Sequence, residues 1–168
     1  MDTFFEQIVG IKRRAKHIVL MMLLWLVAAL IAMVAFIFLR AFGLIAAALL
    51  FYGAFKLSQK FFIEFEYIVT NGTLDIDKII AKSSRKRMVS IDIDKVVSVE
   101  KFNAGAAIKK DESHLLSCNE DDKNAYKLTV SGEAGGRQVI IFAPNDKIKE
   151  AIKKSLPKYI ANSAFKEN

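Results

Sequence analysis

The chain has 168 residues, 53% of them hydrophobic, and a net charge of +7. This length allows one core of ordinary size, and a mean hydropathy of +0.26 is high for a soluble domain. The single cysteine, Cys118, excludes an internal disulfide and agrees with a reducing compartment. A wholly soluble protein and a disulfide-stabilised domain are therefore both disfavoured.

Residues 1–17 combine apolar side chains near one helical face with the basic segment KRRAK at 12–16. The pattern fits two states. One is an interfacial amphipathic helix that leads into a membrane, and the other is a disordered start. We treat this segment as a separate N-terminal part of the chain.

An apolar run from residue 18 to residue 55 contains one charge, Arg40. A single helix over this run would be about 57 Å long, against a hydrocarbon core of about 30 Å. Two helices with a turn near 39–43 fit better. The alternative is one span over 18–39 followed by an interfacial segment. A signal peptide is disfavoured because its apolar region is only about 7–15 residues long.

Flanking charge distinguishes the hairpin from the single span. KRRAK precedes the apolar run, Lys56 and Lys60 follow it, and the far loop has only Arg40. Because cationic flanks stay in the cytoplasm, both ends of the run belong on that side. We therefore predict a transmembrane helical hairpin over 18–60 in the plasma membrane, with both termini cytoplasmic.

From residue 61 the hydrophobic period changes from helical to two. FFIEFEYIVT is followed by Asn71-Gly72, the strongest short-range signal for a β-hairpin. TLDIDKII, RMVSIDID and VVSVEKF continue the alternation, which predicts a meander of antiparallel strands. The alternation places four acidic residues on the outward faces of two of these strands, and we predict no catalytic role for them: Asp75, Asp77, Asp92 and Asp94.

The C-terminal part of the chain ends in a predicted helix. Residues 103–124 are irregular except for a short strand at HLLSC, and two further strands follow at AYKLTVSG and RQVIIFAP. Asn145 is a suitable N-cap, and apolar residues follow it at helical spacing until Pro157. The predicted domain covers 61–160, and 161–168 form a tail.

Six or seven antiparallel strands and one helix indicate a small β-barrel or sandwich, capped by a C-terminal amphipathic helix. The segment EYIVTNGTLDIDKIIAKSSRKRMVSIDI resembles the opening of bacterial pleckstrin-homology-like (PH-like) domains that follow short membrane hairpins. FAPNDKIKEAIKKSLPKYI is similar to the end of such domains. The resemblance implies an α+β membrane protein with two spans and one PH-like domain. It implies no functional residues.

A cluster of cations precedes the third predicted strand. Counting strands from the membrane end brings residues 81–87 and the loop at 109–110 back to that end, and the Asn71-Gly72 turn points away. An anionic leaflet attracts nearby Lys or Arg by about 1 kcal/mol each. Three interpretations remain open: general leaflet contact, a specific lipid pocket, and basic loops that serve topology and solubility alone. The candidate head-group contacts are Lys82, Arg85, Lys86, Arg87, Lys109 and Lys110.

Other chemistry finds little support in the sequence. His114 and Cys118 lack a recognisable third catalytic member. The acidic residues near them lack the spacing and turning glycine of a calcium loop. The cations are not interleaved with exposed aromatic residues, which disfavours nucleic-acid binding. We expect no catalytic residues, metal or cofactor.

The predicted function is that of a non-enzymatic, membrane-anchored PH-like interaction module that binds another protein, with anionic-lipid contact. The alternative is a small oligomeric component of transport or envelope stress, with a scaffold or gating domain. Residues 18–39 contain no charge, which favours the anchor. Two uses of the small residues in the hairpin remain open, internal packing and self-association: Ala28, Ala32, Gly43 and Ala47.

Overall fold

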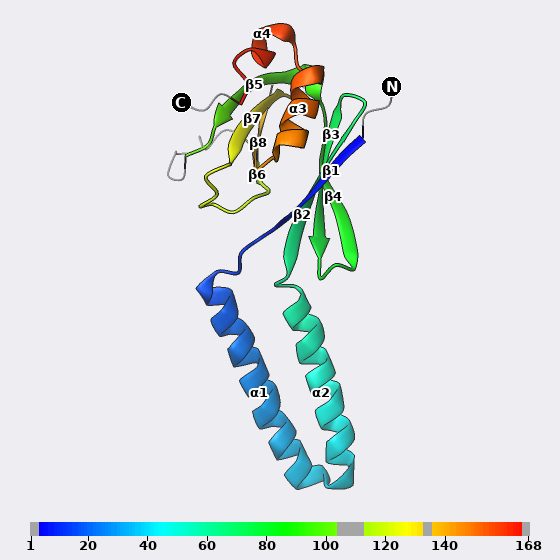
Figure 1. The fold of residues 1–168 in the computed structure, drawn as a ribbon. Helices are drawn as coiled ribbons and strands as arrows, with labels where there is room; N and C mark the ends of the chain where they lie inside the picture. The colour runs from blue at the N-terminus through cyan, green and yellow to red at the C-terminus, as the bar shows by residue number, and fades with distance from the viewer. Residues whose placement is uncertain (1–3, 104–112, 133–135, 166–168) are drawn as a thin grey trace. The chain divides into compact units, whose positions relative to one another are not determined.

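The structure, a computed structural model, describes residues 4–103, 113–132 and 136–165 (Figure 1). These residues form four α-helices, one short 3-10 helix and eight β-strands. They divide into two compact units. The helical unit is Lys12–Ile63 with Ile80–Ser84, and the sheet unit is Met1–Ile11, Glu64–Ile79 and Arg85–Asn168.

The helical unit is a hairpin of two apolar helices. α1 covers Ala15–Leu39 and α2 covers Ala41–Gln59, and both are long and apolar enough to cross a membrane. At 1.5 Å per residue their lengths are about 37 Å and about 28 Å. Arg40 lies between them with φ 48, inside the region where the sequence predicted a turn.

Small residues allow the two helices to pack closely. Ala28 and Ala32 of α1 and Gly43 of α2 are buried. A Cβ atom on Gly43 would lie 2.5 Å from the Cα of Phe36, so only glycine fits there. These three residues serve packing within the hairpin, which is one of the two uses that the sequence left open.

Residues 4–10 of the N-terminal segment form a β-strand, so neither of the two states that the sequence left open, an interfacial helix or a disordered start, is correct for them. β1, Phe4–Gly10, pairs antiparallel with β2, Ile63–Thr70, in a register that runs from Phe4↔Thr70 to Gly10↔Glu64. A short apolar segment fits both a helical and an alternating period. Here the segment forms a strand because the edge of β2 is available to pair with it. The helical hairpin is therefore an insertion between two neighbouring strands of one sheet.

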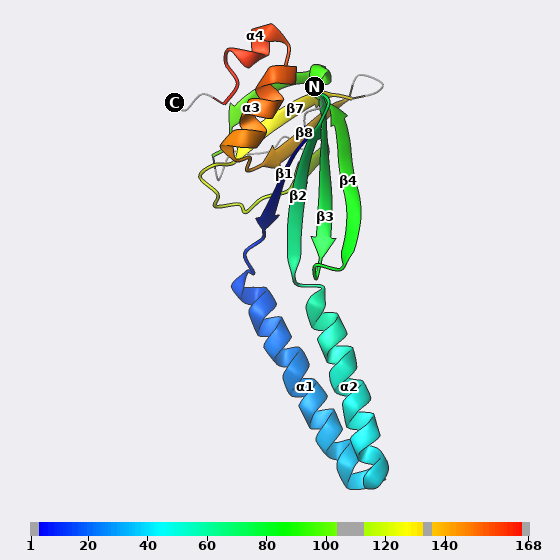
Figure 2. The same ribbon diagram turned by 45° about the vertical axis from the view of Figure 1, so that its right-hand side comes forward.

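The first sheet has the strand order β1-β2-β3-β4, with β3 at Thr73–Ile80 and β4 at Ser84–Asp92 (Figure 2). The predicted turn between β2 and β3 is confirmed. Asn71 and Gly72 have φ values of 46 and 87, which a tight two-residue hairpin requires.

The second sheet has the order β5-β7-β8-β6. β5 covers Val96–Lys101 and β6 covers Ser113–Leu116, while β7 and β8 cover Tyr126–Ser131 and Arg137–Phe142. The sequence left a barrel and a sandwich open, and the closed barrel is wrong because there are two separate sheets. The expectation that all strands are antiparallel is also wrong, because β6 runs parallel to β8. Residues 117–136, which include β7, join β6 to β8, and a connection of this length permits a parallel pair. The 3-10 helix η1, Ile93–Lys95, separates β4 from β5.

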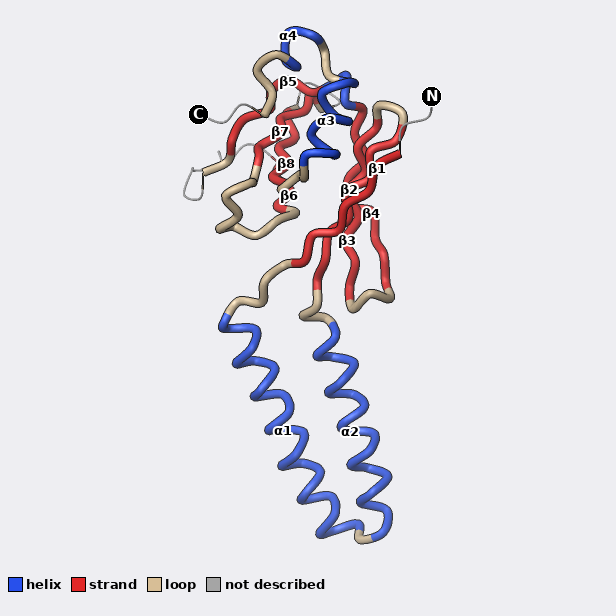
Figure 3. Tube along the Cα trace, viewed as in Figure 1, coloured by secondary structure: helices blue, strands red, loops and turns tan. Residues whose placement is uncertain are grey.

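Two helices complete the sheet unit (Figure 3). α3, Asp146–Ser155, contacts β1 and η1, and α4, Lys158–Ala161, contacts β5. The predicted N-cap is confirmed, because the Asn145 side chain accepts a hydrogen bond from the Ile148 N–H at 2.9 Å. The largest fully buried side chains of the core include Tyr67, Leu74, Ile76, Leu128, Ile140, Phe142, Ile148 and Ile152.

Tyr67 ties β2 to the second sheet. Its hydroxyl donates to the Ser117 carbonyl oxygen at 2.6 Å and accepts from the Ala143 N–H at 3.3 Å. Its ring meets Phe142 edge-on, with the centroids 5.7 Å apart. Burial raises the pKa of Tyr67, so the hydroxyl keeps its proton as a hydrogen-bond donor.

Candidate functional site

The cations of the predicted basic loop do not lie together as one group. Lys82 belongs to the helical unit with the rest of the turn at 80–84. The Ala81 N–H donates to the Phe62 carbonyl oxygen at 2.9 Å, just beyond the end of α2. Ala81 and Lys82 both have positive φ values, 53 and 56, which make the turn tight.

Further cations lie close to Phe62 within the helical unit. The Arg13 guanidinium lies 4.0 Å from the centroid of the Phe62 ring, and Lys60 is two positions before it in the chain. The rings of His17 and Phe61 lie beside each other at 5.6 Å. We call Arg13, Lys60 and Lys82 the α2-end cations. They come from both ends of the hairpin and from the β3–β4 turn.

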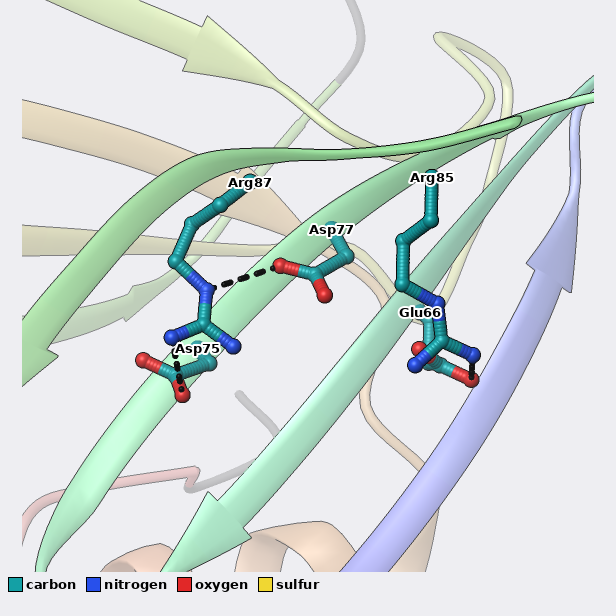
Figure 4. Close-up of polar contacts among 5 residues, drawn as sticks. All are labelled: Glu66, Asp75, Asp77, Arg85 and Arg87. Atoms are coloured by element: carbon teal, nitrogen blue, oxygen red, sulfur yellow. Dashed lines mark hydrogen bonds and ion pairs between the residues drawn. The ribbon is translucent and has the colours of Figure 1, made fainter.

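Arg85 instead pairs with a carboxylate of β2, across β3, and Arg87 pairs with two carboxylates of the neighbouring strand β3 (Figure 4). Arg85 Nη2 lies 2.8 Å from Glu66 Oε1. Arg87 Nε lies 3.0 Å from Asp77 Oδ1, and its Nη1 lies 3.1 Å from Asp75 Oδ2. We call these five residues the ion-pair network of the first sheet.

Two of the three carboxylates of this network are buried, Asp75 is partly buried, and the arginines are exposed. The side chains of Glu66 and Asp77 are 1% and 5% exposed, against 55% for Arg85 and 54% for Arg87. The prediction that Asp77 faces outward to solvent is therefore wrong. Alternation assigns a residue to a face, but only the strands around it decide whether that face is covered.

Two oxygen atoms of the network remain without a hydrogen bond in the described part of the chain, Glu66 Oε2 and Asp75 Oδ1. Burial raises the pKa of Glu66, and a hydrogen bond with Glu6 of β1 raises it further, while the charge of Arg85 opposes both effects. The hydrogen bond to Asp77, together with the charge of Asp75, raises the pKa of Arg87. Folding therefore makes Glu66 harder to ionise than a free glutamate.

Replacing Glu66 by glutamine is expected to change how stability depends on pH. Because the folded-state pKa of Glu66 is raised, the folded chain holds this proton more tightly than the unfolded chain. Its stabilising contribution is fully present below the unfolded pKa, near 4.5, and is lost as the pH rises through the folded pKa. The Glu66→Gln variant lacks this decrease in the free energy of unfolding with rising pH, which can reach about 1.4 kcal/mol per pH unit.

Urea unfolding of the full chain in detergent between pH 4 and pH 8 measures this difference. Glu64→Gln, on the same strand, is the matched control and should keep the pH dependence of the unmodified chain. Parallel curves for Glu66→Gln and the unmodified chain would show that Glu66 does not titrate differently on folding.

Of the remaining predicted contact residues, the structure describes one. Lys86 is exposed on β4. Lys109 and Lys110 lie outside the described residues. The structure therefore places Lys82 with the α2-end cations and both arginines with buried acids, and it leaves lipid contact by any of them as a prediction.

Cys118 is buried with Ala125, Val139, Ile141 and Ala143. Burial raises the pKa of its thiol to about 12, so the reactive thiolate is scarce near neutral pH. In this position Cys118 packs as a small apolar side chain.

Hydrogen bonds between nearby residues stabilise the acidic turn near Asp122. The Asn124 N–H donates to Asp122 Oδ1 at 2.9 Å, and the Ala125 N–H donates to the Asp122 carbonyl oxygen at 3.1 Å. Asp111 and Glu112, two further acidic residues near His114 in the sequence, lie outside the described residues. Among the residues that are described, no group of His, Cys, Asp or Glu could hold a metal ion.

Sequence reasoning missed the network, although a signal was present. Asp75 and Asp77 are two positions apart on β3, and Arg85 and Arg87 have the same spacing on the next strand. Opposite charges at matched spacing on consecutive hairpin strands predict cross-strand pairs. Glu66 gave no comparable signal, because β3 lies between it and Arg85. Glu6 gave none, because β1 was not recognised as a strand.

A family model described as bacterial PH-like domain (DUF6106) matches residues 1–162. This match covers both apolar helices and all eight described strands. Neither a curated protein nor a solved structure matches the chain. The resemblance stated from the sequence is confirmed.

Proposed function

The chain belongs to the bacterial PH-like domain family DUF6106, and on this premise we propose that it is a membrane-anchored interaction module. Its two apolar helices hold a PH-like domain at the cytoplasmic face of the plasma membrane. The domain binds another protein, and the α2-end cations contact anionic lipid. The proposal assigns the chain no catalytic role.

The observation that carries the proposal is the position of the hairpin inside the domain. Gly10 and Glu64 are cross-strand partners on β1 and β2. The chain therefore leaves the sheet for α1 and returns from α2 at neighbouring residues. A single span would put these two residues on opposite sides of a bilayer about 30 Å thick, which does not agree with their pairing. The pairing supports a hairpin with both ends on one side.

Charge supports the cytoplasmic side. The segment at 12–16 carries four cations, and Lys56 and Lys60 flank the other end of the hairpin. The turn between the helices has only Arg40. Flanking Lys and Arg residues remain on the cytoplasmic side during insertion, so the domain and both termini are placed there.

The α2-end cations support a contact with lipid head groups. Arg13 and the turn that carries Lys82 both contact Phe62, next to the end of a candidate span. Each cation near an anionic leaflet contributes about 1 kcal/mol, less at high salt. Because the domain is already anchored, such a contact sets its orientation and does not recruit it.

Cysteine labelling tests the proposed topology. Cysteines are introduced one at a time at Asp2, Phe42 and Asn168 in the full chain, and intact cells are treated with a membrane-impermeant maleimide. We expect labelling at position 42 only, and labelling at positions 2 and 168 after permeabilisation. The unmodified chain is the control, because its single Cys118 is buried. Labelling at position 2 or position 168 in intact cells contradicts the hairpin.

A separate experiment tests the lipid contact. The full chain is purified in mild detergent, and co-purified anionic phospholipid is measured by mass spectrometry. The Lys60→Glu, Lys82→Glu double variant is expected to retain several-fold less anionic lipid than the unmodified chain. Lys147→Glu with Lys154→Glu, on α3, is the matched control of equal charge. Equal retention in both double variants contradicts the lipid contact and leaves the anchor intact.

A further inference from the structure

We propose that the surface around Tyr126, between β5 and α3, is where the module binds its protein partner. The partner offers an acidic peptide segment with one aromatic residue, and Phe165 of this chain covers the surface until that segment displaces it. This inference rests on the proposed function and names its binding surface. We call Lys101, Tyr126, Lys149, Lys153 and Phe165 the tyrosine patch.

Three cations converge on two aromatic rings in this patch. Lys101 Nζ of β5 lies 4.8 Å from the centroid of the Tyr126 ring, and Lys149 Nζ of α3 lies 5.2 Å from it. Lys153 Nζ lies 5.9 Å from the Phe165 ring. The two rings meet edge-on with centroids 5.0 Å apart. Cation–π contacts of this kind hold a cation weakly, by about 0.5–1 kcal/mol at exposed sites.

Positive charge in the patch is only partly compensated. Lys149 pairs with Asp146 at 3.3 Å, and the Asp146 side chain is 94% exposed. Within the described part of the chain, Lys101 and Lys153 have no carboxylate at ion-pair distance. An acidic segment supplies the missing carboxylates, and charge-assisted contacts of Lys with carboxylates are stronger than neutral ones.

The hydroxyl of Tyr126 is the second sign of an unfilled site. Tyr126 is 1% exposed, and its hydroxyl is buried without a hydrogen-bond partner among the described residues. A buried polar group left in this state costs about 1–3 kcal/mol, and native proteins rarely leave one. A ligand carboxylate that enters when Phe165 leaves can accept this hydrogen bond.

Phe165 has the properties of a removable cover. It is 7% exposed and has φ 58, in the left-handed region that a bulky residue rarely adopts. That conformation costs about 1–2 kcal/mol, which the contact with Tyr126 offsets. Displacement by another aromatic side chain relieves the strain and keeps the ring contact.

Peptide binding to the full chain in neutral nanodiscs tests the inference. The probe is the fluorescein-labelled peptide Glu-Asp-Phe-Asp-Glu, measured by fluorescence anisotropy. The Phe165→Ala variant is expected to bind it about tenfold more tightly than the unmodified chain, a difference of about 1.4 kcal/mol. Adding Lys101→Glu and Lys153→Glu should abolish the gain. Adding Lys147→Glu and Lys154→Glu, two exposed lysines outside the patch, should leave most of it.

A second variant, a chain that ends at residue 162, repeats the test without Phe165, and thermal unfolding checks the folding of both. If both variants unfold, Phe165 is a core residue and the inference is wrong. It is also wrong if Phe165→Ala gains no affinity, if Lys-Lys-Phe-Lys-Lys binds equally well, or if the gain is for anionic vesicles and not for the peptide. These outcomes leave the labelling pattern of the termini unchanged, so they are distinct from a failure of the proposed function.

Discussion

A chain in which Gly10 is joined to Glu64 through an Asn-Gly turn is expected to fold as a water-soluble domain with cooperative unfolding. The two residues lie directly opposite each other on antiparallel strands. A two-residue turn of this sequence closes such a pair with the twist that the strands require. The hairpin is then absent, while β1 keeps its place at the edge of the first sheet.

The comparison is the chain 61–160, the domain that the sequence suggested, which lacks β1 and also the buried residues Ala164 and Phe165. We expect it to be about 3–5 kcal/mol less stable, or unfolded at 25 °C. Gln7 of β1 donates from Nε2 to the Ala143 carbonyl oxygen at 2.9 Å, and its Oε1 accepts from the Asn145 N–H at 2.7 Å. Loss of β1 leaves these groups unpaired and exposes the edge of β2.

Urea unfolding followed by circular dichroism, with size-exclusion chromatography for aggregation, measures both chains. Equal stability of the joined chain and the 61–160 chain would mean that β1 contributes little. The sequence alone suggested a domain that begins at residue 61, because the alternating period starts there. The structure shows that an earlier strand completes the sheet.

Replacing Arg87 by methionine is expected to destabilise the sheet unit by about 2–3 kcal/mol at pH 7. Asp77 is 5% exposed and would keep its charge without a partner. Removing one member of a fully buried ion pair costs about 3–5 kcal/mol. The expected value is lower because Arg87 is itself 54% exposed and solvent screens part of the interaction.

Two controls identify the cause. Lys86→Met, one residue earlier and on the exposed part of β4, should change stability by less than about 0.5 kcal/mol. Arg87→Met combined with Asp75→Asn and Asp77→Asn should recover most of the loss, because no unpaired charge remains buried. Similar losses for Lys86→Met and Arg87→Met would mean that strand propensity, and not the ion pair, accounts for the effect.

Local chemistry in the sequence was enough to predict several elements. The apolar run and its one interior charge predicted two helices with a break near Arg40. Asn71-Gly72 predicted a hairpin, because few other dipeptides tolerate two positive φ values. Asn145 predicted the start of α3, because its side chain can accept from the first-turn N–H groups. Each of these features depends on residues within a few positions of one another.

Contacts between distant segments decided the rest. β1 forms because β2, more than fifty residues later, offers a free edge, and residues 4–10 alone do not distinguish a strand from a helix. The parallel β6 and the separation into two sheets depend on which strands meet in space. Arg85 and Arg87 are part of a basic loop in the sequence, yet they neutralise acids on β2 and β3.

The same reason applies to the tyrosine patch. Lys101, Tyr126, Lys149 and Phe165 come from β5, β7, α3 and the C-terminal segment, and no spacing rule connects them. A hydrophobic period of two residues in a strand, or of three to four in a helix, indicates which face of its own element a side chain occupies. Tertiary packing determines what that face contacts. It places Arg85 and Arg87 of the basic loop in an ion-pair network, and it places Phe165 against Tyr126, where we propose that it covers the binding surface.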